Sequence, residues 1–228
     1  MKTIGLLGNA SWPSTFQYYE RINQEANRRL GGWHSAKIML YGIDYHPIKS
    51  AYTDAPERIP GMLAAELRRL IAAGIDGLLI CNNTLHQYFD ILQRDNFYGG
   101  EVFHALRLTA EHAAQKGYAR VLLLGTKKTM QSSFFKDYLA EKGVVSVVPS
   151  PEEMDMVQAA QSRLSVGSDP HAEKAYFSAL IDKYRNAADA VVLGCTELPL
   201  AVSDGNACLP TVNPILLQCD AAVDFMLA

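Results

Sequence analysis

The sequence places one cysteine, Cys195, where a thiol could do chemistry. Residues 193–197 read Leu-Gly-Cys-Thr-Glu and follow a short apolar segment. The thiol therefore stands at the carboxyl end of a predicted buried strand, where the first amides of the next helix favour a thiolate. Gly194 allows close backbone approach at this point. A cysteine alone is more often an inert core residue, so the flanking Gly, Thr and Glu are what indicate an acid, a base or a nucleophile.

A second segment of the chain repeats this pattern without the cysteine. Residues 76–84 resemble residues 189–197, and residues 4–9 resemble residues 121–126. Both repeats are separated by nearly half of the chain, which predicts a duplicated α/β unit. In this repeat Asn82 is equivalent to Cys195. A carboxamide does not titrate, so Asn82 can orient a ligand but cannot transfer a proton.

Short apolar segments alternate with stretches of helical length along the chain. The predicted strands are residues 3–7, 36–41, 77–81, 120–124, 144–148 and 190–193. The stretches 14–30 and 56–73 are typical of amphipathic helices. This alternation predicts an α/β protein of two pseudo-symmetric lobes, each a parallel sheet flanked by helices, with the active-site cleft between them. We expect residues 1–102 and 207–228 to form the first lobe and residues 103–206 the second.

The composition excludes several classes of protein. Of the 228 residues, 49% are hydrophobic and 20% are charged, as in ordinary compact proteins, and the net charge of -3 offers no attractive field to nucleic acid or to anionic lipid. No apolar run approaches the roughly 18 residues that a membrane span requires, and Met1 leads directly into a strand-like segment. We therefore expect a cytoplasmic protein without a nucleic-acid or membrane partner.

The remaining cysteines do not indicate a metal centre. The chain has four cysteines, none in Cys-x-x-Cys spacing: Cys81, Cys195, Cys208 and Cys219. This scatter weakens both a zinc site and a redox-active dithiol. No metal is predicted.

Three segments together resemble the aspartate/glutamate racemase superfamily. They are residues 5–15, residues 81–86 and residues 194–198, and the resemblance spans nearly the whole chain. The Gly-Cys-Thr-Glu sequence of residues 194–197 is its most specific part, since a glycine-bearing first turn alone would be weak evidence.

The resemblance implies an isomerase that needs no cofactor, pyridoxal phosphate included. It also implies a homodimer and a small acidic amino acid or dicarboxylate as substrate, held between the lobes. In the family pattern each lobe supplies one cysteine, and the two act from opposite faces of the α-carbon. Oriented amides and side-chain donors would stabilise the carbanion-like charge.

The sequence departs from this pattern at Asn82, which stands where most relatives carry the first cysteine. Cys81 is one residue away, and such a step along a strand turns a side chain to the other face. Because the strand ends there, Cys81 could still have taken over the role. The candidate catalytic residues are therefore Cys195, Asn82 and Cys81.

Several polar residues after the predicted strands could bind the substrate. A hydroxyl at a helix N-terminus can hold a carboxylate together with the amides there, or can simply cap the helix. Asn at position 9, where relatives usually have glycine, can adopt a positive φ. The expected substrate contacts are Ser11, Asn9, Asn83, Thr84, Thr126, Thr196 and Glu197.

Three functions remain open from the sequence. The first is a racemase or related isomerase acting on aspartate, glutamate or a similar dicarboxylate through cysteine-mediated proton transfer. The second is a single-cysteine decarboxylase or isomerase of the same superfamily, which would protonate only one face. The third is a catalytically silent carboxylate-binding homologue that keeps the scaffold but has lost an essential thiol.

Overall fold

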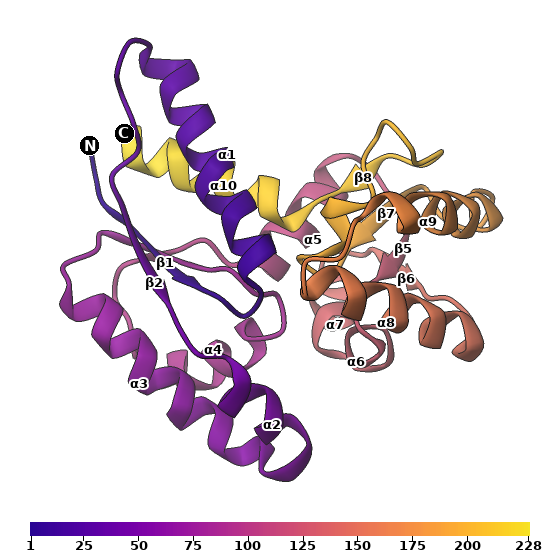
Figure 1. The fold of residues 1–228 in the computed structure, drawn as a ribbon, viewed down its shortest axis with the longest axis horizontal. Helices are drawn as coiled ribbons and strands as arrows, with labels where there is room; N and C mark the ends of the chain where they lie inside the picture. Colours follow the sequence, from indigo (N-terminus) through magenta and orange to yellow (C-terminus); the bar gives the residue numbers. More distant parts are fainter. The chain divides into compact units, whose positions relative to one another are not determined.

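The computed structural model describes residues 1–228, which divide into two compact units (Figure 1). The first unit consists of Met1–His104 and Ile215–Ala228, and the second of Ala105–Pro214. No helix is both long and apolar enough to cross a membrane.

Each unit is built around a parallel sheet of four strands. The strands of the first unit are β1 (Ile4–Gly8), β2 (Ile38–Gly42), β3 (Gly77–Ile80) and β4 (Glu101–Val102). Those of the second unit are β5 (Arg120–Leu124), β6 (Val145–Val147), β7 (Ala190–Leu193) and β8 (Thr211–Val212). The spatial orders are β2-β1-β3-β4 and β6-β5-β7-β8, and all pairings are parallel. The same order in both units confirms the predicted duplication of an α/β unit.

Helices connect the strands in both units. The first unit contains α1 (Trp12–Leu30), α2 (His46–Asp54), the short 3₁₀ helix η1 (Pro56–Arg58), α3 (Ile59–Ala72), α4 (His86–Gln93) and α10 (Pro214–Leu227), whose first residue belongs to the second unit. The second unit contains α5 (Ala105–Gln115), α6 (Lys127–Gln131), α7 (Phe134–Glu141), α8 (Pro151–Ser165), α9 (His171–Lys183) and the 3₁₀ helix η2 (Leu198–Leu200).

The unit boundaries differ from those expected from the sequence, 102/103 and 206/207. The chain passes between units after His104 and again after Pro214. The second difference has a clear cause: Thr211–Val212 forms strand β8 and pairs with β7, so the segment before it stays with the second sheet. A two-residue strand leaves no periodic signal in the sequence.

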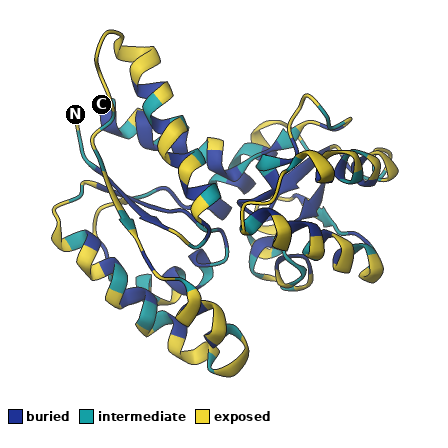
Figure 2. Ribbon diagram, viewed as in Figure 1, coloured by how far each residue is buried: buried dark blue, intermediate teal, exposed yellow.

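The central strands β1, β3, β5 and β7 are buried on both faces, apart from Arg120 at the start of β5, whereas the edge strand β2 is partly exposed (Figure 2). In the first unit, Leu7, Leu78 and Ile80 pack with residues of α3 and α4 in one apolar cluster. In the second, alternate residues of β5 and β7 pack with residues of α8 and α9 in another. The intervening residues Val121 and Leu123 are buried as well. Buried parallel strands of this kind explain the nearly continuous apolar runs in the sequence.

Helix α8 begins at a capping box. The Ser150 hydroxyl accepts from the Glu153 amide, and the Glu153 carboxylate accepts from the Ser150 amide at 2.9 Å. The same carboxylate accepts from Lys183 and from the Tyr184 hydroxyl, each at 2.6 Å, which ties α9 to the start of α8. These contacts, with Lys183 the largest cause, hold the pKa of Glu153 at about 2.

We predict that Glu153→Gln lowers the free energy of unfolding by about 1–2 kcal/mol at neutral pH. Because the folded pKa lies below the unfolded value of about 4.3, the stabilisation is complete above the unfolded pKa and is lost as the pH falls toward the folded one. Denaturant unfolding of the unaltered protein and of Glu153→Gln should be followed from neutral to acid pH. The difference between their free energies of unfolding should shrink as the pH falls. A difference that stays the same at acid pH would contradict this role of the Glu153 carboxylate. So would a difference of the same size in the control variant Glu141→Gln, on α7.

Candidate active site

The strand ends of the two units are equivalent in their backbone hydrogen bonds. In the first unit the amide of Cys81, just after β3, donates to the carbonyl of Leu7 at 3.0 Å. In the second the amide of Gly194, just after β7, donates to the carbonyl of Leu124 at 2.6 Å. Cys81 is thus equivalent to Gly194, and the next residue, Asn82, is equivalent to Cys195.

Asn82 uses its side-chain oxygen inside the protein. Its Oδ1 accepts from the amide of Leu85 at 2.8 Å, at the start of α4. The carboxamide is thereby fixed with its oxygen on the backbone, which leaves the Nδ2 group to serve a ligand. Toward a substrate, Asn82 can therefore donate a hydrogen bond but cannot act as an acid or a base.

Asn83 is buried without satisfying its side chain. It is only 3% exposed, and neither its Oδ1 nor its Nδ2 has a hydrogen-bond partner in the protein. Leaving a buried polar group unpaired costs about 1–3 kcal/mol. A polar ligand at the end of β3 would offset this cost. Thr84 follows and is partly exposed.

Ser11 has the same character at the end of the neighbouring strand, β1. It is the residue before α1, yet its hydroxyl makes no capping hydrogen bond and has no partner although buried. Its carbonyl accepts instead from the hydroxyls of Ser14 and Thr15. Ser11 therefore does not cap α1 through its side chain, and its hydroxyl remains available to a ligand.

Asn9 adopts the left-handed conformation that the sequence suggested, with φ of 68°. Its amide donates to the Thr15 hydroxyl at 2.9 Å. Its side chain lies over the backbone of Gly42, where a Cβ atom would sit 2.4 Å from Nδ2. Asn9 thus shapes the turn between β1 and α1.

Cys81 lies inside the first unit. It is fully buried, and burial raises the pKa of its thiol. Since the thiolate is the reactive form, this surrounding argues against proton transfer by Cys81 and favours a packing role. The equivalent residue of the second unit is Gly194, which has no side chain.

Gly194 is required by close packing at the end of β7. A Cβ atom there would lie 2.8 Å from the carbonyl oxygen of Leu124, and one at Gly125 would lie 3.3 Å from the carbonyl carbon of Gly194. The two strand ends therefore touch through their backbones. This contact fixes the backbone position of the next residue, Cys195.

Cys195 donates a hydrogen bond to a buried carboxylate. Its Sγ lies 2.8 Å from Oε2 of Glu197, and the two residues are 9% and 3% exposed. The Thr196 hydroxyl donates to the other oxygen, Oε1, at 3.2 Å. An ionised carboxylate at this distance would disfavour negative charge on sulfur. The thiolate expected from helix-start amides is thus opposed by Glu197, which interacts with Cys195 rather than standing free for a substrate.

Thr126 is the cap of α6, at the end of β5 next to β7. Its hydroxyl accepts from the amide of Thr129 at 3.1 Å and lies 2.8 Å from the Thr129 hydroxyl. Among the predicted residues of the second unit, Cys195, Thr196 and Glu197 contact one another directly, while Thr126 lies on the adjacent strand end.

Two buried glutamines near these strand ends were not among the predicted site residues. Gln161 of α8 donates from Nε2 to Oε2 of Glu197 at 3.1 Å. Gln218 of α10 accepts from the Tyr18 hydroxyl at 2.9 Å, donates to the carbonyl of Phe103 at 2.7 Å, and lies 3.4 Å from His86. In the sequence, each residue is a glutamine on the buried stripe of an amphipathic helix, and this feature could have indicated both of them.

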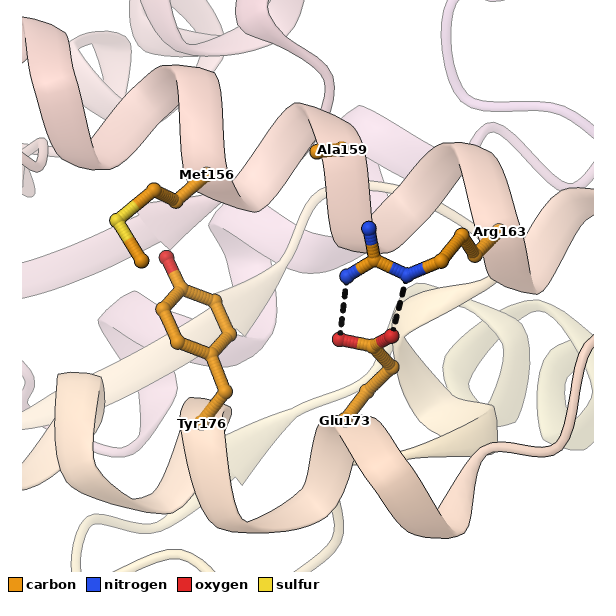
Figure 3. Close-up of a pocket in the computed structure, with 5 residues that line it drawn as sticks. All are labelled: Met156, Ala159, Arg163, Glu173 and Tyr176. Carbon is orange, nitrogen blue, oxygen red and sulfur yellow. Dashed lines mark hydrogen bonds and ion pairs between the residues drawn. The ribbon is translucent and has the colours of Figure 1, made fainter.

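A cavity of about 300 Å³ lies between α8 and α9 (Figure 3). Its charged groups, Arg163 and Glu173, pair with each other through two hydrogen bonds of 2.6 and 3.0 Å. Because this pair is self-sufficient, the cavity joins two helices and does not present a free charge to a ligand.

We predict that Cys81 resists alkylation in the native protein. Its burial and raised pKa leave little accessible thiolate at mildly alkaline pH, whereas Cys208 is exposed. Peptide mass spectrometry after brief iodoacetamide treatment should find Cys208 modified and Cys81 modified only after unfolding. Equal rates at the two cysteines would contradict the packing role.

Comparisons with known proteins agree with the α/β fold of the two units. The model of the Asp/Glu/Hydantoin racemase family matches residues 7–225. A Yersinia pestis protein proposed to be an Asp/Glu racemase has 31% identity and a TM-score of 0.87, and an aspartate racemase homologue from Pyrococcus horikoshii OT3 has 28% identity and a TM-score of 0.84. Both matches cover 100% of each chain.

The aspartate racemase of Picrophilus torridus shares the fold. Its TM-score is 0.83 at 22% identity, over 99% of this chain and 94% of that one. The family match extends over both units and includes every strand end described above. The chain belongs to the Asp/Glu/Hydantoin racemase family.

Proposed function

We propose that this protein is a cofactor-independent racemase or isomerase that moves a proton at the α-carbon of aspartate, glutamate or a related small dicarboxylate. The observation that carries the proposal is the Cys195 thiol, hydrogen-bonded to the buried carboxylate of Glu197 at the end of β7. Family membership supports a racemase-type reaction. Cys195 is the residue to which we assign the proton transfer.

The chemistry of Cys195 follows from its partner. In the resting pair the proton lies on sulfur, and Cys195 is an acid that can protonate a carbanion or an enediolate. When Glu197 takes that proton over the 2.8 Å hydrogen bond, the sulfur becomes a thiolate that can remove the α-proton. One thiol can therefore remove a proton from one face of the substrate or return it to that face. Racemisation also needs a proton donor and acceptor on the opposite face, and we assign that role to a water molecule.

The first unit would supply binding and charge stabilisation. We propose that Ser11, Asn82 and Asn83 bind the substrate, with Thr84 beside them. The support is that buried polar atoms of Ser11 and Asn83 lack partners within the protein, and that the Asn82 oxygen is already engaged. Donors fixed before the substrate arrives stabilise developing negative charge without reorganising. In the second unit, Thr126 and Thr196 take the corresponding place.

The same observations favour a second reaction. Asn82 cannot transfer a proton, and Glu197 keeps the Cys195 proton on sulfur at rest, so a site that protonates one face of an enediolate is chemically complete. Decarboxylation of a malonate-type substrate would give a product of one hand, whereas racemisation gives both. Product chirality therefore distinguishes the two reactions. Thermal stabilisation by the dicarboxylate without turnover would identify a silent binder.

We also propose that the protein forms a homodimer through α1. Trp12, Phe16 and Tyr19 follow one another at helical spacing and are 65%, 62% and 45% exposed. Leu40 of the edge strand β2 is exposed too. Large exposed apolar side chains gathered in this way are typical of a contact surface, and a second copy of the chain is the partner that we propose.

We predict that α-proton exchange depends on Cys195. The protein should exchange the α-proton of at least one of L-Asp, D-Asp, L-Glu and D-Glu in heavy water, followed by NMR. Cys195→Ala should slow this exchange at least about a hundredfold, because it removes the general acid and base. Cys208→Ala, a matched loss of an exposed thiol, should have no effect. Exchange that survives Cys195→Ala would refute the assigned role.

For the dimer, we expect Phe16→Asp to shift the protein from dimer to monomer in sedimentation velocity experiments at micromolar concentration, since it buries a charge in an apolar contact. Phe16 is exposed, so the fold should tolerate the change. As a control, Val166→Asp changes an exposed apolar residue of the second unit and should leave the dimer intact. A monomeric unaltered protein would contradict the proposal.

A further inference from the structure

A chain of carboxamides connects α6 with Glu197 through α8. The amide of Lys127, the first residue of α6, donates to Oε1 of Gln158 at 2.8 Å. Gln158 Nε2 donates to Oε1 of Gln161 at 3.0 Å, and Gln161 Nε2 donates to Oε2 of Glu197 at 3.1 Å. All of these groups lie in the second unit.

The direction of these hydrogen bonds fixes the orientation of Gln161. Because Gln158 donates to its oxygen, Gln161 must present its Nε2 group to the carboxylate. Gln161 is also buried, on the stripe of α8 that includes Val157, Ala160 and Leu164. A buried glutamine with both ends of its amide engaged is held in one position.

Gln161 and the thiol meet at the same oxygen. Oε2 of Glu197 accepts from Gln161 Nε2 and from Cys195 Sγ, while Oε1 accepts from the Thr196 hydroxyl. Gln161 and Thr196 are uncharged, so Cys195 is the titratable group in contact with the carboxylate through these bonds. A carboxylate held from both sides keeps one oxygen on the sulfur. Without Gln161 it can rotate away.

We propose that Gln161, oriented by Gln158, is a positioning residue that holds the Glu197 carboxylate against Cys195 and so sets how firmly the thiol keeps its proton. This rests on the proposed function for the reaction, although the coupling itself is a property of the second unit. Gln161 reaches Cys195 only through Glu197 and needs no contact with the substrate.

The test is the ionisation of Cys195, followed by the ultraviolet absorbance of its thiolate. In a Cys208→Ser background, the difference between each protein and its Cys195→Ala counterpart isolates this thiol. Glu197→Gln removes the anion, and we expect the midpoint to fall by about one pH unit or more. Gln161→Leu should move it in the same direction by at least about half a unit, because the freed carboxylate no longer faces the sulfur.

Two further variants keep the result interpretable. Gln158→Leu should shift the midpoint of the Cys195 titration in the same direction by a smaller amount. It replaces Gln161→Leu in the test if that variant does not fold. Val157→Ala loosens α8 without touching the chain of amides, and should leave the midpoint in place. In exchange assays Gln161→Leu should change kcat and its pH profile more than KM.

Several results would overturn the proposal. One is a midpoint that moves in Glu197→Gln but not in either glutamine variant, and another is a midpoint that moves in none of the three. A shift of equal size in Val157→Ala would show general loosening instead of positioning. Loss of the proposed function is recognised separately, by exchange that persists in Cys195→Ala, and it leaves the absorbance titration unaffected.

Discussion

The chemistry that we propose for this protein depends on one hydrogen bond, from the Cys195 thiol to the Glu197 carboxylate. The contact requires that β7 ends just before it, and Gly194 permits this by letting two strand ends touch through their backbones. The chain then turns into η2, and this turn brings residue 197 back onto residue 195. A buried carboxylate needs donors, which Thr196 and Gln161 provide. We propose that the same contacts that satisfy the anion also set how firmly the thiol keeps its proton.

The two units share one architecture and differ in what stands at the end of the central strands. Both sheets have the same strand order, and both strand ends are held by equivalent backbone hydrogen bonds. At the equivalent positions, however, one unit has the Cys195 thiol and the other has the Asn82 amide, whose oxygen is bound to the Leu85 amide. Duplicated scaffolds of this kind allow one half to specialise in proton transfer and the other in binding. This division underlies both the racemase proposal and its decarboxylase alternative.

Much of the fold could be predicted from the sequence, because buried parallel strands appear as short apolar runs. The strands Arg120–Leu124 and Ala190–Leu193 have the predicted bounds. The two-residue strands β4 and β8 were missed since they are too short for a pattern, and β8 displaced a predicted boundary. At the candidate site, the residues at the strand ends could be predicted from the sequence, but their hydrogen-bond partners could not. The contact of Gln161 with Glu197 depends on tertiary packing that no local pattern encodes. The burial of Cys81, in contrast, follows the alternation of side chains along β3.

We propose that a single thiol, Cys195, transfers the proton of the substrate and that the Asn82 amide binds the same substrate. The most direct measurement is a crystal structure with bound aspartate or a related dicarboxylate, from which the distances of Cys195 Sγ and Asn82 Nδ2 to the ligand are taken. We predict Sγ within about 3.5 Å of the α-carbon on one face, and Nδ2 within hydrogen-bond distance of a ligand oxygen. A ligand bound elsewhere, or a Cys195 sulfur that faces away from the α-carbon, would contradict the account.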